Sequence, residues 1–270
     1  MINNSVRRAL LNREITIGSW IQIGHAASPE ILANVGYDWI GFDCEHSDID
    51  IVVFSSLMRG AFGRGSAPFV RVKENDALNI RQALDMGACG VIVPLINNPE
   101  EAQQAVTAAK FPPLGNRGYG YCRANNYGKD FASYAATAND ETCVIAMIES
   151  KEGIKNIEEI LAVKGIDGVF VGPYDLSGSY GIPGQTDHHL ILEARKMVLD
   201  ACKKANKSAG LHIVKAIPDN IAQVLEEGFT FIALGADIVF LRESAEKALD
   251  VARSVSQSIQ ALITSYERSY

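Results

Sequence analysis

Short apolar runs recur along the chain, and four of them follow closely on a glycine that ends a stretch of helical pattern. Glycine suits the left-handed position just past the end of a helix. An apolar run without polar alternation suits a parallel strand that is buried on both faces. The pattern therefore predicts repeated units of helix, glycine turn and buried strand, most clearly at Gly36, Gly87, Gly165 and Gly228.

Eight such strands are predicted, with helical patterns between most of them. They lie at about 15–22, 38–43, 67–72, 90–95, 143–149, 167–172, 208–213 and 229–234. A last helix is expected from Ser244 to about Ser265, where apolar residues recur at helical spacing. Eight strands alternating with helices predict a (β/α)8 barrel. A doubly wound open sheet is the alternative, and the lack of a GxGxxG motif after the first strand counts against it.

The interval between the fourth and fifth predicted strands is much longer than the others. After a helix at about 99–110, it continues through residues 111–140, which are rich in Gly, Pro, Asn and Tyr. Loops of this length are uncommon unless they have a function. No low-complexity linker divides the 270 residues, so we expect one (β/α)8 barrel domain over 1–270 with a long insert.

The formal charge is −7, from 25 Lys and Arg against 32 Asp and Glu. This balance argues against a nucleic-acid binder, which presents a basic face, but it is no guide to the charge of a substrate in a cleft. The N-terminus lacks an apolar stretch of signal-peptide length, and no run approaches a membrane span. The five cysteines are scattered without CxxC spacing, which argues against disulfides and a zinc site. We expect a cytoplasmic protein that binds neither nucleic acid nor membranes.

Several predicted strands end in residues that carry chemistry. His46 follows the second strand, and Arg71 ends the third. Glu149 ends the fifth strand, and Asp175 follows the sixth. Barrel enzymes place their catalytic groups at the carboxyl ends of the strands. We therefore expect these four side chains to converge on one mouth of the barrel.

Glu149 and Asp175 are hard oxygen ligands, which favour Mg²⁺ or Mn²⁺. Two protein ligands leave positions open for a chelating substrate such as a 2-oxo acid. The ion would polarise the keto group and stabilise an enolate, and Arg71 would stabilise charge on the same oxygen. An imidazole such as that of His46 is suited to moving a proton.

Each of these residues also has a structural interpretation. Isolated acids are usually solvated, and a lone loop histidine usually has no catalytic role. The convergence of four such residues, and the apolar strand directly before Glu149, favour function. His212 is as consistent with packing at the mouth as with function. A Schiff base on Lys73 or Lys215 is an alternative chemistry, but no lysine ends the fifth or sixth strand.

Six motifs are together specific: FDCEH at 42–46, PFVRV at 68–72, ALDMGACGVIVP at 83–94, PPLGNRGYG at 112–120, IES at 148–150 and GVFVGPYDLSGSYG at 168–181. On these motifs the chain, from Gly18 to the final helix, resembles the metal-dependent (class II) pyruvate aldolases of the HpcH/HpaI type. That family includes 4-hydroxy-2-oxoheptanedioate aldolase and 2-keto-3-deoxy-sugar-acid aldolases.

The resemblance implies a barrel whose C-terminal helix is exchanged between subunits, in a homohexamer of paired barrels. It implies a divalent ion (Mg²⁺, Mn²⁺ or Co²⁺) on Glu149 and Asp175, and no organic cofactor. It also implies that Arg71 stabilises the enolate and that His46 is catalytic and is oriented by Asp85.

The segment Gly172, Pro173, Tyr174 and Asp175 would bind the substrate, with the backbone amides around Tyr174 and Asp175 holding the pyruvate carboxylate. The implied reaction is aldol cleavage, or condensation in reverse, of a 4-hydroxy-2-oxo acid to pyruvate and an aldehyde through a metal-stabilised enolate. The alternatives are oxaloacetate decarboxylation, citrate-synthase-like carbon–carbon bond formation and, less favoured, a non-catalytic barrel that binds a 2-oxo acid.

Three residues depart from those common in the family. Many members have glutamine in place of Met147, alanine or asparagine in place of Tyr174, and a small residue in place of Cys44. The enolate chemistry does not depend on these positions, but the pocket for the aldehyde does. The sequence therefore leaves the aldehyde open.

Asp85 and the long insert both belong to the N-terminal end of the predicted barrel. Asp85 comes just before the strand that begins near Gly90, so it should lie far from its own His46. Residues 112–140 follow a helix and precede a strand, so they start at the same end. We therefore predict that Asp85 and the substrate-binding Arg123 act at the active site of an adjacent subunit.

Overall fold

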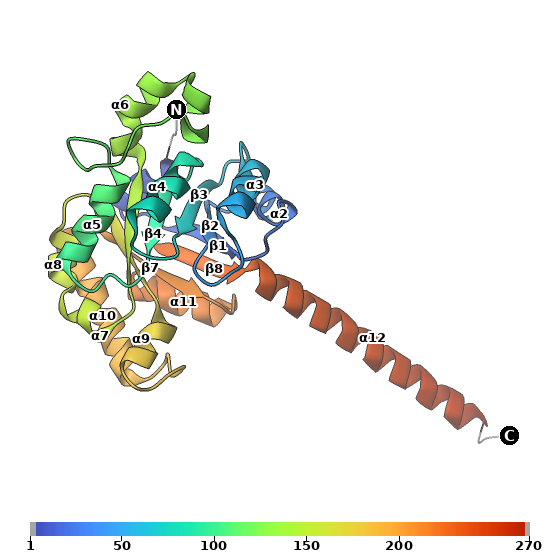
Figure 1. Cartoon of the computed structure of the whole chain (residues 1–270). Coiled ribbons are helices and arrows are strands. Elements are labelled where there is room, and N and C mark those ends of the chain that lie inside the picture. The colour runs from blue at the N-terminus through green and yellow to red at the C-terminus, as the bar shows by residue number, and fades with distance from the viewer. Residues whose placement is uncertain (1–3, 268–270) are drawn as a thin grey trace.

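The barrel predicted from the apolar runs is present. In the computed structural model, which describes residues 4–267, eight parallel strands pair in sequence order, and β1 pairs with β8 to close the sheet (Figure 1). The strands are β1 (Thr16–Ile21), β2 (Trp39–Asp43), β3 (Ala67–Arg71), β4 (Gly90–Val93), β5 (Cys143–Ile148), β6 (Gly168–Val171), β7 (Ser208–Ile213) and β8 (Phe231–Ala236). Their bounds lie within two residues of the predicted ones, and the closure rules out the open sheet.

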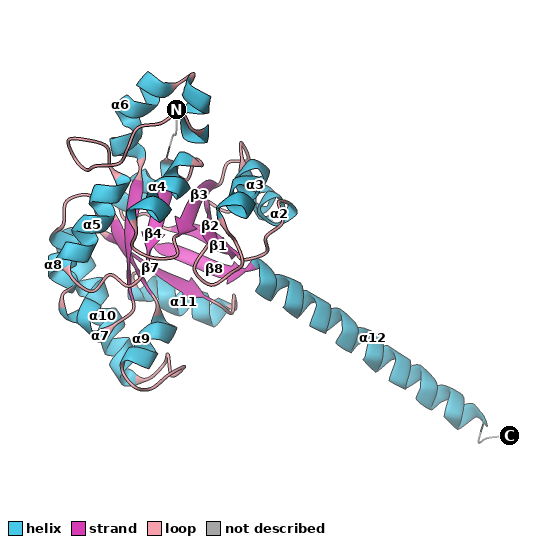
Figure 2. Ribbon diagram, viewed as in Figure 1, coloured by secondary structure: helices cyan, strands magenta, loops and turns pink. Residues whose placement is uncertain are grey.

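Helices lie outside the sheet, and most of them pack around the barrel (Figure 2). Outside the insert they are α1 (Ser5–Leu11), α2 (Ala27–Val35), α3 (Ile51–Ala61), α4 (Ala77–Asp85), α5 (Pro99–Ala109), α7 (Lys151–Lys155), α8 (Ile157–Ala162), α9 (Pro173–Ser179), α10 (His189–Ala205), α11 (Pro218–Glu227) and α12 (Asp237–Glu267). Gly36 and Gly228 end α2 and α11 with φ of 103° and 106°. This is the left-handed geometry that the glycine pattern predicted.

Aromatic side chains fill the centre of the barrel. Trp39 stacks on Phe231 with ring centroids 4.2 Å apart, and Trp20 meets Phe170 edge to face at 5.8 Å. Val6 of α1 packs into the same buried cluster, so α1 covers the N-terminal end of the barrel. The opposite end of the barrel, formed by the carboxyl ends of the strands, is therefore left open. Barrel enzymes have their active sites at that end.

The long insert between α5 and β5 forms a loop, a 3-10 helix η1 (Arg123–Gly128) and α6 (Phe131–Glu141). It packs beside the carboxyl end of α4. There the buried Arg117 guanidinium donates to Asp85 at 2.7 Å and to the Tyr134 hydroxyl at 3.0 Å. The insert therefore lies at the N-terminal end of the barrel, as predicted.

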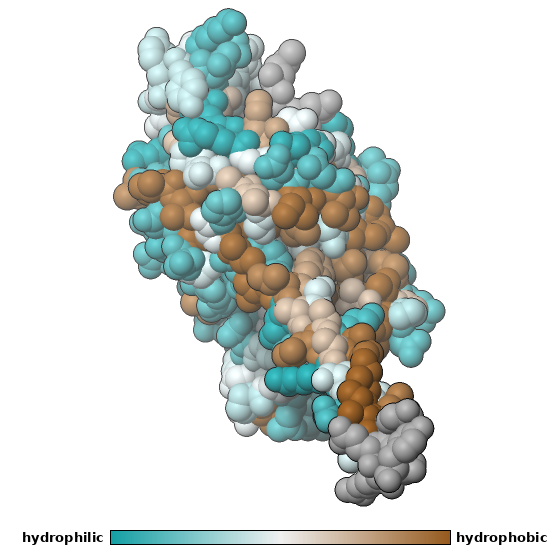
Figure 3. Space-filling model, turned by 90° about the vertical axis from the view of Figure 1, so that its right-hand side faces the viewer, coloured by the Kyte–Doolittle hydropathy of each residue, from teal (hydrophilic) through white to brown (hydrophobic). Residues whose placement is uncertain are grey.

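Helix α12 leaves the barrel directly after β8 and projects away from it (Figure 1). It begins at Asp237, earlier than the predicted start at Ser244. Many of its apolar side chains are exposed, among them Leu241, Leu249, Val251, Val255, Ile259 and Leu262. Figure 3 shows hydrophobic surface along the helix and around its base. Within residues 4–267, no helix has both the length and the apolar character needed to cross a bilayer.

Candidate active site

A cavity of about 130 Å³ opens at the carboxyl ends of the strands. Its lining combines large apolar side chains with charged and amide groups. The residues are Trp20, Gln22, Asp43, Arg71, Met147, Phe170, Val171, Gly172, Pro173, Tyr174, Asp175, His212, Val214 and Ala236. The predicted residues Arg71 and Gly172 to Asp175 are therefore brought together here.

Arg71 is held by Asp43 in a two-point ion pair. The two residues are register partners at the ends of β3 and β2. Arg71 Nε and Nη2 donate to Asp43 Oδ1 and Oδ2 at 2.9 and 2.6 Å. Burial alone would raise the pKa of Asp43, but the bonds and charge of Arg71 outweigh it, and the pKa lies below its ordinary value. The pair is therefore ionised, and it fixes the guanidinium at the edge of the cavity.

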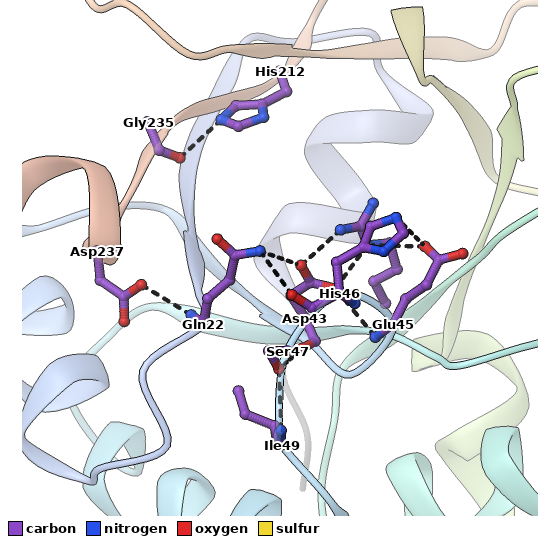
Figure 4. Close-up of polar contacts among 10 residues, drawn as sticks. Gln22, Asp43, Glu45, His46, Ser47, Ile49, His212, Gly235 and Asp237 are labelled. Carbon is purple, nitrogen blue, oxygen red and sulfur yellow. Dashed lines mark hydrogen bonds and ion pairs between the residues drawn. The ribbon is translucent and has the colours of Figure 1, made fainter. Parts of the chain in front are cut away.

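The loop after β2 carries Glu45 and His46 next to this ion pair (Figure 4). The amides of both residues donate to Asp43 Oδ1, at 3.2 and 3.1 Å. Glu45 Oε2 lies 3.3 Å from Arg71 Nε and 3.7 Å from His46 Nε2, and burial raises the pKa of Glu45. The His46 side chain is 57% exposed, so its ring is accessible to a substrate that enters the mouth.

Glu149 is buried directly after β5. Its Oε1 accepts a hydrogen bond of 2.7 Å from the Leu95 amide. Burial raises the pKa of Glu149 to about 7, and repulsion from Glu45 and Asp175 adds to this, against the opposing effect of the Leu95 bond. A buried carboxylate whose charged neighbours include two further carboxylates would be stabilised by a bound cation.

Gly172 and the first turn of α9 form the wall beside Glu149. A Cβ atom on Gly172 would lie 2.9 Å from Glu149 Oε2, so a larger residue here would push the carboxylate aside. Pro173 occupies the start of α9, where its missing N–H costs nothing. Tyr174 is 59% exposed at the rim, and Asp175 is also exposed.

Glu149 and Asp175 fit the predicted hard divalent ion. Both are oxygen donors of the type that Mg²⁺ and Mn²⁺ prefer, and the nearby Glu45 Oε2 is buried without a hydrogen-bond partner. Among the described residues, no group of three or more His, Cys, Asp and Glu is placed to hold an ion. With two carboxylate ligands, an ion would keep positions open for a substrate.

Residues 16–244 match the HpcH/HpaI aldolase/citrate lyase family. The chain belongs to this family. It is 35% identical over 248 residues to a 5-keto-4-deoxy-D-glucarate aldolase of Enterobacter sp. (strain 638), covering 92% of this chain and 96% of that one. It is 36% identical over 241 residues to a hydroxypyruvate/pyruvate aldolase of Roseobacter denitrificans, covering 88% and 93%.

Among solved structures, an HpcH/HpaI aldolase/citrate lyase family protein of Burkholderia cenocepacia superposes with a TM-score of 0.89 at 33% identity. The match covers 93% of this chain and 100% of that chain. The chain is thus a carbon–carbon lyase of the aldolase type, as the six motifs indicated.

In this HpcH/HpaI family member, no lysine belongs to the described lining of the cavity. Lys73 lines a separate small cavity with Cys44 and Asp50, and Lys215 is exposed. The arrangement therefore gives no support to the alternative of a Schiff base.

Asp85 and Arg123 lie away from the cavity of their own chain. Asp85 ends α4, at the end of the barrel opposite His46. Arg123 Nη1 donates to the Met86 carbonyl at 2.8 Å, and its guanidinium lies 4.7 Å from the ring centroid of Phe62. The two residues are thus at the N-terminal end, as predicted, and their action at a neighbour's site stays a prediction.

His212 packs against the mouth, which favours the structural interpretation. Its Nε2 lies 3.0 Å from the Gly235 carbonyl oxygen, and its ring meets Trp20 edge to face at 6.3 Å. Burial lowers the pKa of His212 to about 4, so the ring is neutral in the folded protein near neutral pH.

Asp43, Gln22 and Asp237 also belong to the site, although no role was predicted for them from the sequence. The Gln22 side-chain Nε2 donates to Asp43 Oδ2 at 2.7 Å, and the Gln22 backbone N–H donates to Asp237 at 2.9 Å (Figure 4). A signal did exist for Asp43, because it ends its strand as Arg71 ends the next strand. Gln22 and Asp237 are 215 residues apart, and no local pattern connects them.

Proposed function

We propose that this aldolase reversibly cleaves a 4-hydroxy-2-oxo acid to pyruvate and an aldehyde, with Mg²⁺, Mn²⁺ or Co²⁺ and no organic cofactor. The observation that carries the proposal is that Arg71 and Asp175 line one cavity, while Glu149 is buried behind its Gly172 wall and interacts electrostatically with both. The relatives named as keto-deoxy-sugar-acid and hydroxypyruvate/pyruvate aldolases support it.

Glu149 and Asp175 are the residues that would hold the ion. When bound, it supplies a Lewis acid that polarises the keto oxygen of the 2-oxo acid. Binding requires both carboxylates in their ionised form. The raised pKa of Glu149 therefore makes proton release part of metal binding near neutral pH.

Arg71 stabilises the negative charge that develops on the keto oxygen as the C3–C4 bond breaks. A guanidinium has five N–H donors, and Asp43 engages only donors on Nε and Nη2. The remaining donors are available to the substrate. Because Asp43 and the ring of Trp20, 5.0 Å away, already hold the group, little reorganisation is needed during the reaction.

The first turn of α9 binds the carboxylate of the 2-oxo acid. The amides at the start of a helix have no acceptor within the helix, and the helix dipole favours an anion there. The amides of Tyr174 and Asp175 serve this role, with Gly172 and Pro173 shaping the backbone before them. This places the anionic end of the substrate beside Glu149.

His46 accepts the proton of the C4 hydroxyl during cleavage and returns it during condensation. Its ring is exposed at the mouth, 3.7 Å from Glu45 Oε2. Neutral imidazole is a suitable general base near pH 7. Asp85 of an adjacent subunit orients the ring in the assembled enzyme.

The proposed assembly is a homohexamer of paired barrels that exchange α12. The exposed apolar side chains of α12 form a surface of the kind that marks a protein interface. Asp85 and Arg123 lie at the N-terminal end of their barrel, where Arg117 and the Met86 carbonyl hold them. They reach a catalytic mouth only when it belongs to another subunit.

Proton exchange at the methyl group of pyruvate tests the proposed enolate chemistry. The protein is incubated with pyruvate in D₂O and each divalent ion, quenched with EDTA, and the methyl signal is followed by ¹H NMR. We expect exchange that depends on the ion and stops with EDTA. No exchange with any ion would refute the proposal, and EDTA-insensitive exchange that borohydride arrests would assign it to a lysine.

A panel of aldehydes then separates the aldolase from its alternatives. We expect pyruvate to be consumed together with at least one aldehyde. A rate of oxaloacetate decarboxylation above every aldol rate would instead favour the decarboxylase.

A further inference from the structure

Asp237, the first residue of α12, binds the loop that follows β1. It is buried, and its carboxylate accepts hydrogen bonds from the amides of Gln22 and Ile23, at 2.9 and 3.0 Å, and from the Ser28 hydroxyl. It also accepts the amide of Ile238 at 2.8 Å. One side chain therefore ties the start of α12 to two amides of the loop after β1 and to the first turn of α2.

Gln22, which lines the cavity, extends this connection from Asp237 to Asp43, as Figure 4 shows. Its Nε2 donates to Asp43 Oδ2 at 2.7 Å and, at 3.4 Å, to the His46 carbonyl oxygen. Asp43 Oδ2 also accepts the bond from Arg71 Nη2 at 2.6 Å. The side-chain amide of Gln22 and the guanidinium of Arg71 thus both donate to the same oxygen atom, Asp43 Oδ2.

The donors around a buried carboxylate determine its rotation. On Oδ2 the described partners of Asp43 are Gln22 and Arg71, so removal of Gln22 leaves Arg71 as the donor there. Asp43 Oδ1 stays bonded to the Glu45 and His46 amides and to Arg71 Nε, but Oδ2 has lost one of its two donors. The carboxylate can then pivot about Oδ1 and shift the Nη2 end of the guanidinium. A misplacement of about 1 Å is enough to lower a reaction rate strongly.

We propose that Gln22 and Asp237 are positioning residues of the active site. Asp237 holds the backbone of Gln22, the side-chain amide of Gln22 holds Asp43, and Asp43 holds Arg71. The proposal rests on the proposed function for the role of Arg71. Residues 241–263 of α12 are exposed. The position of α12 on the barrel is therefore linked to the position of Arg71 through Asp237, at the base of the helix.

Two substitutions and two controls test this relay. Gln22→Leu replaces the side-chain amide with an apolar side chain of similar size. Asp237→Asn removes the negative charge that holds the loop after β1. Gln103→Leu on the exposed face of α5 and Asp200→Asn on the exposed face of α10 make the same chemical changes elsewhere. Pyruvate methyl exchange is measured with Mg²⁺ as a function of pyruvate concentration.

We expect Q22L and D237N to lower kcat by about 10- to 100-fold with KM changed by less than about threefold, because an interaction made in the transition state is lost. The controls should stay within about twofold. In an R71K background, Q22L should cost less than about twofold, because the effect passes through Arg71. An equal loss in both backgrounds would overturn the proposal, since a general structural role predicts it.

Crystal structures of Q22L and D237N give a readout that does not depend on activity. We expect at least one of the two Arg71–Asp43 hydrogen bonds to be lost in each. If both bonds keep their wild-type lengths in Q22L, the positioning role is wrong, whatever the rates. Absence of exchange in the wild type would refute the proposed function instead, and the structures would still decide the relay.

Discussion

Asp43 and Arg71 end neighbouring strands and are joined by two hydrogen bonds of 2.9 and 2.6 Å. Their side chains are only 1% and 11% exposed. Breaking a buried ion pair by removing one partner is costly, because the survivor is left as an uncompensated charge. The contact therefore bears on stability as well as on the proposed placement of Arg71 for catalysis.

We predict that Asp43→Asn weakens both properties. The substitution keeps the size of the side chain but removes the two-point counter-charge of Arg71 and leaves it only Glu45, at 3.3 Å. This should cost about 3 kcal/mol of unfolding free energy. It should lower kcat for pyruvate exchange by about 100-fold, the order expected when one charge-stabilising group is lost. Urea unfolding and the NMR exchange assay measure the two effects. Asp48→Asn, on the same loop but exposed, is the control; a D43N protein as stable as D48N would contradict the prediction.

For Glu149→Gln we predict opposite effects on stability and on metal binding. The neutral amide still offers an oxygen to the Leu95 amide, but it removes a buried charge that Glu45 and Asp175 repel. In EDTA at pH 7.5, E149Q should therefore be at least as stable as the wild type. Its affinity for Mn²⁺, measured by calorimetry, should fall by at least about 100-fold because a ligand is lost. Asp175→Asn should also lose affinity, without a gain in stability, because Asp175 is exposed.

The same residue gives the metal-free protein a defined pH dependence. The folded-state pKa of Glu149 is raised to about 7 from 4.5, so the folded state binds this proton more tightly than the unfolded state. Through this group, stability therefore increases as pH falls from 7 to 4.5, by roughly 2–3 kcal/mol. The difference in unfolding free energy between wild type and E149Q, in EDTA at pH 5 and pH 7.5, isolates this contribution. A difference that does not change with pH would show that Glu149 is ionised throughout.

His212 should give the folded protein the opposite pH dependence of stability. Burial lowers its folded-state pKa to about 4 from 6.5, so between these values the unfolded state binds more protons. Its contribution to stability is therefore complete above pH 6.5 and is lost as pH falls toward 4, by roughly 2–3 kcal/mol. His212→Asn, which keeps a donor for the Gly235 carbonyl, should flatten the decline in unfolding free energy between pH 6.5 and pH 4.5. Exposed His189→Asn serves as the control, and an equal decline in H212N and H189N would refute the assignment.

Much of the fold and part of the site could be predicted because their signals are local. A glycine that ends a helix and an apolar run after it are close in sequence, so the strand positions followed from each unit separately. The rule that parallel strands end at one mouth then placed Arg71 and Asp175 on one cavity. The same rule placed Asp85 at the other end, next to the insert.

The residues that fix the geometry of the site were missed because their partners are distant in sequence. Asp43 reads as an acid at a strand end, and only the register of β2 on β3 shows that it meets Arg71. Asp237 reads as the start of a helix, and its bond to Gln22 depends on closure of β8 on β1. Inside the insert, Asn126 and Tyr127 both adopt left-handed φ of 54°. Asparagine favours this conformation, but tyrosine rarely adopts it, so the sequence does not predict it at Tyr127.

Subunit complementation tests whether Asp85 acts in a neighbouring active site. Asp85→Asn and Arg71→Lys proteins, each of low activity, are mixed, unfolded together and refolded. If Asp85 serves a neighbour's mouth, random assembly of equal amounts gives about a quarter of the sites one intact mouth and one intact Asp85. Pyruvate exchange by the mixture should therefore reach about a quarter of the wild-type rate, well above that of either parent refolded alone.

The matched control is a mixture of Arg71→Lys and His46→Asn proteins. Both residues belong to the mouth of one chain, because the Arg71 side chain and the His46 backbone N–H both donate to Asp43 Oδ1 of that chain. No reassortment of these subunits creates an intact site, so this mixture should stay at the level of its parents. Equal activity in the two mixtures would place Asp85 outside the active site. Recovery in the Asp85 mixture alone would show that the insert end of one barrel completes the mouth of another.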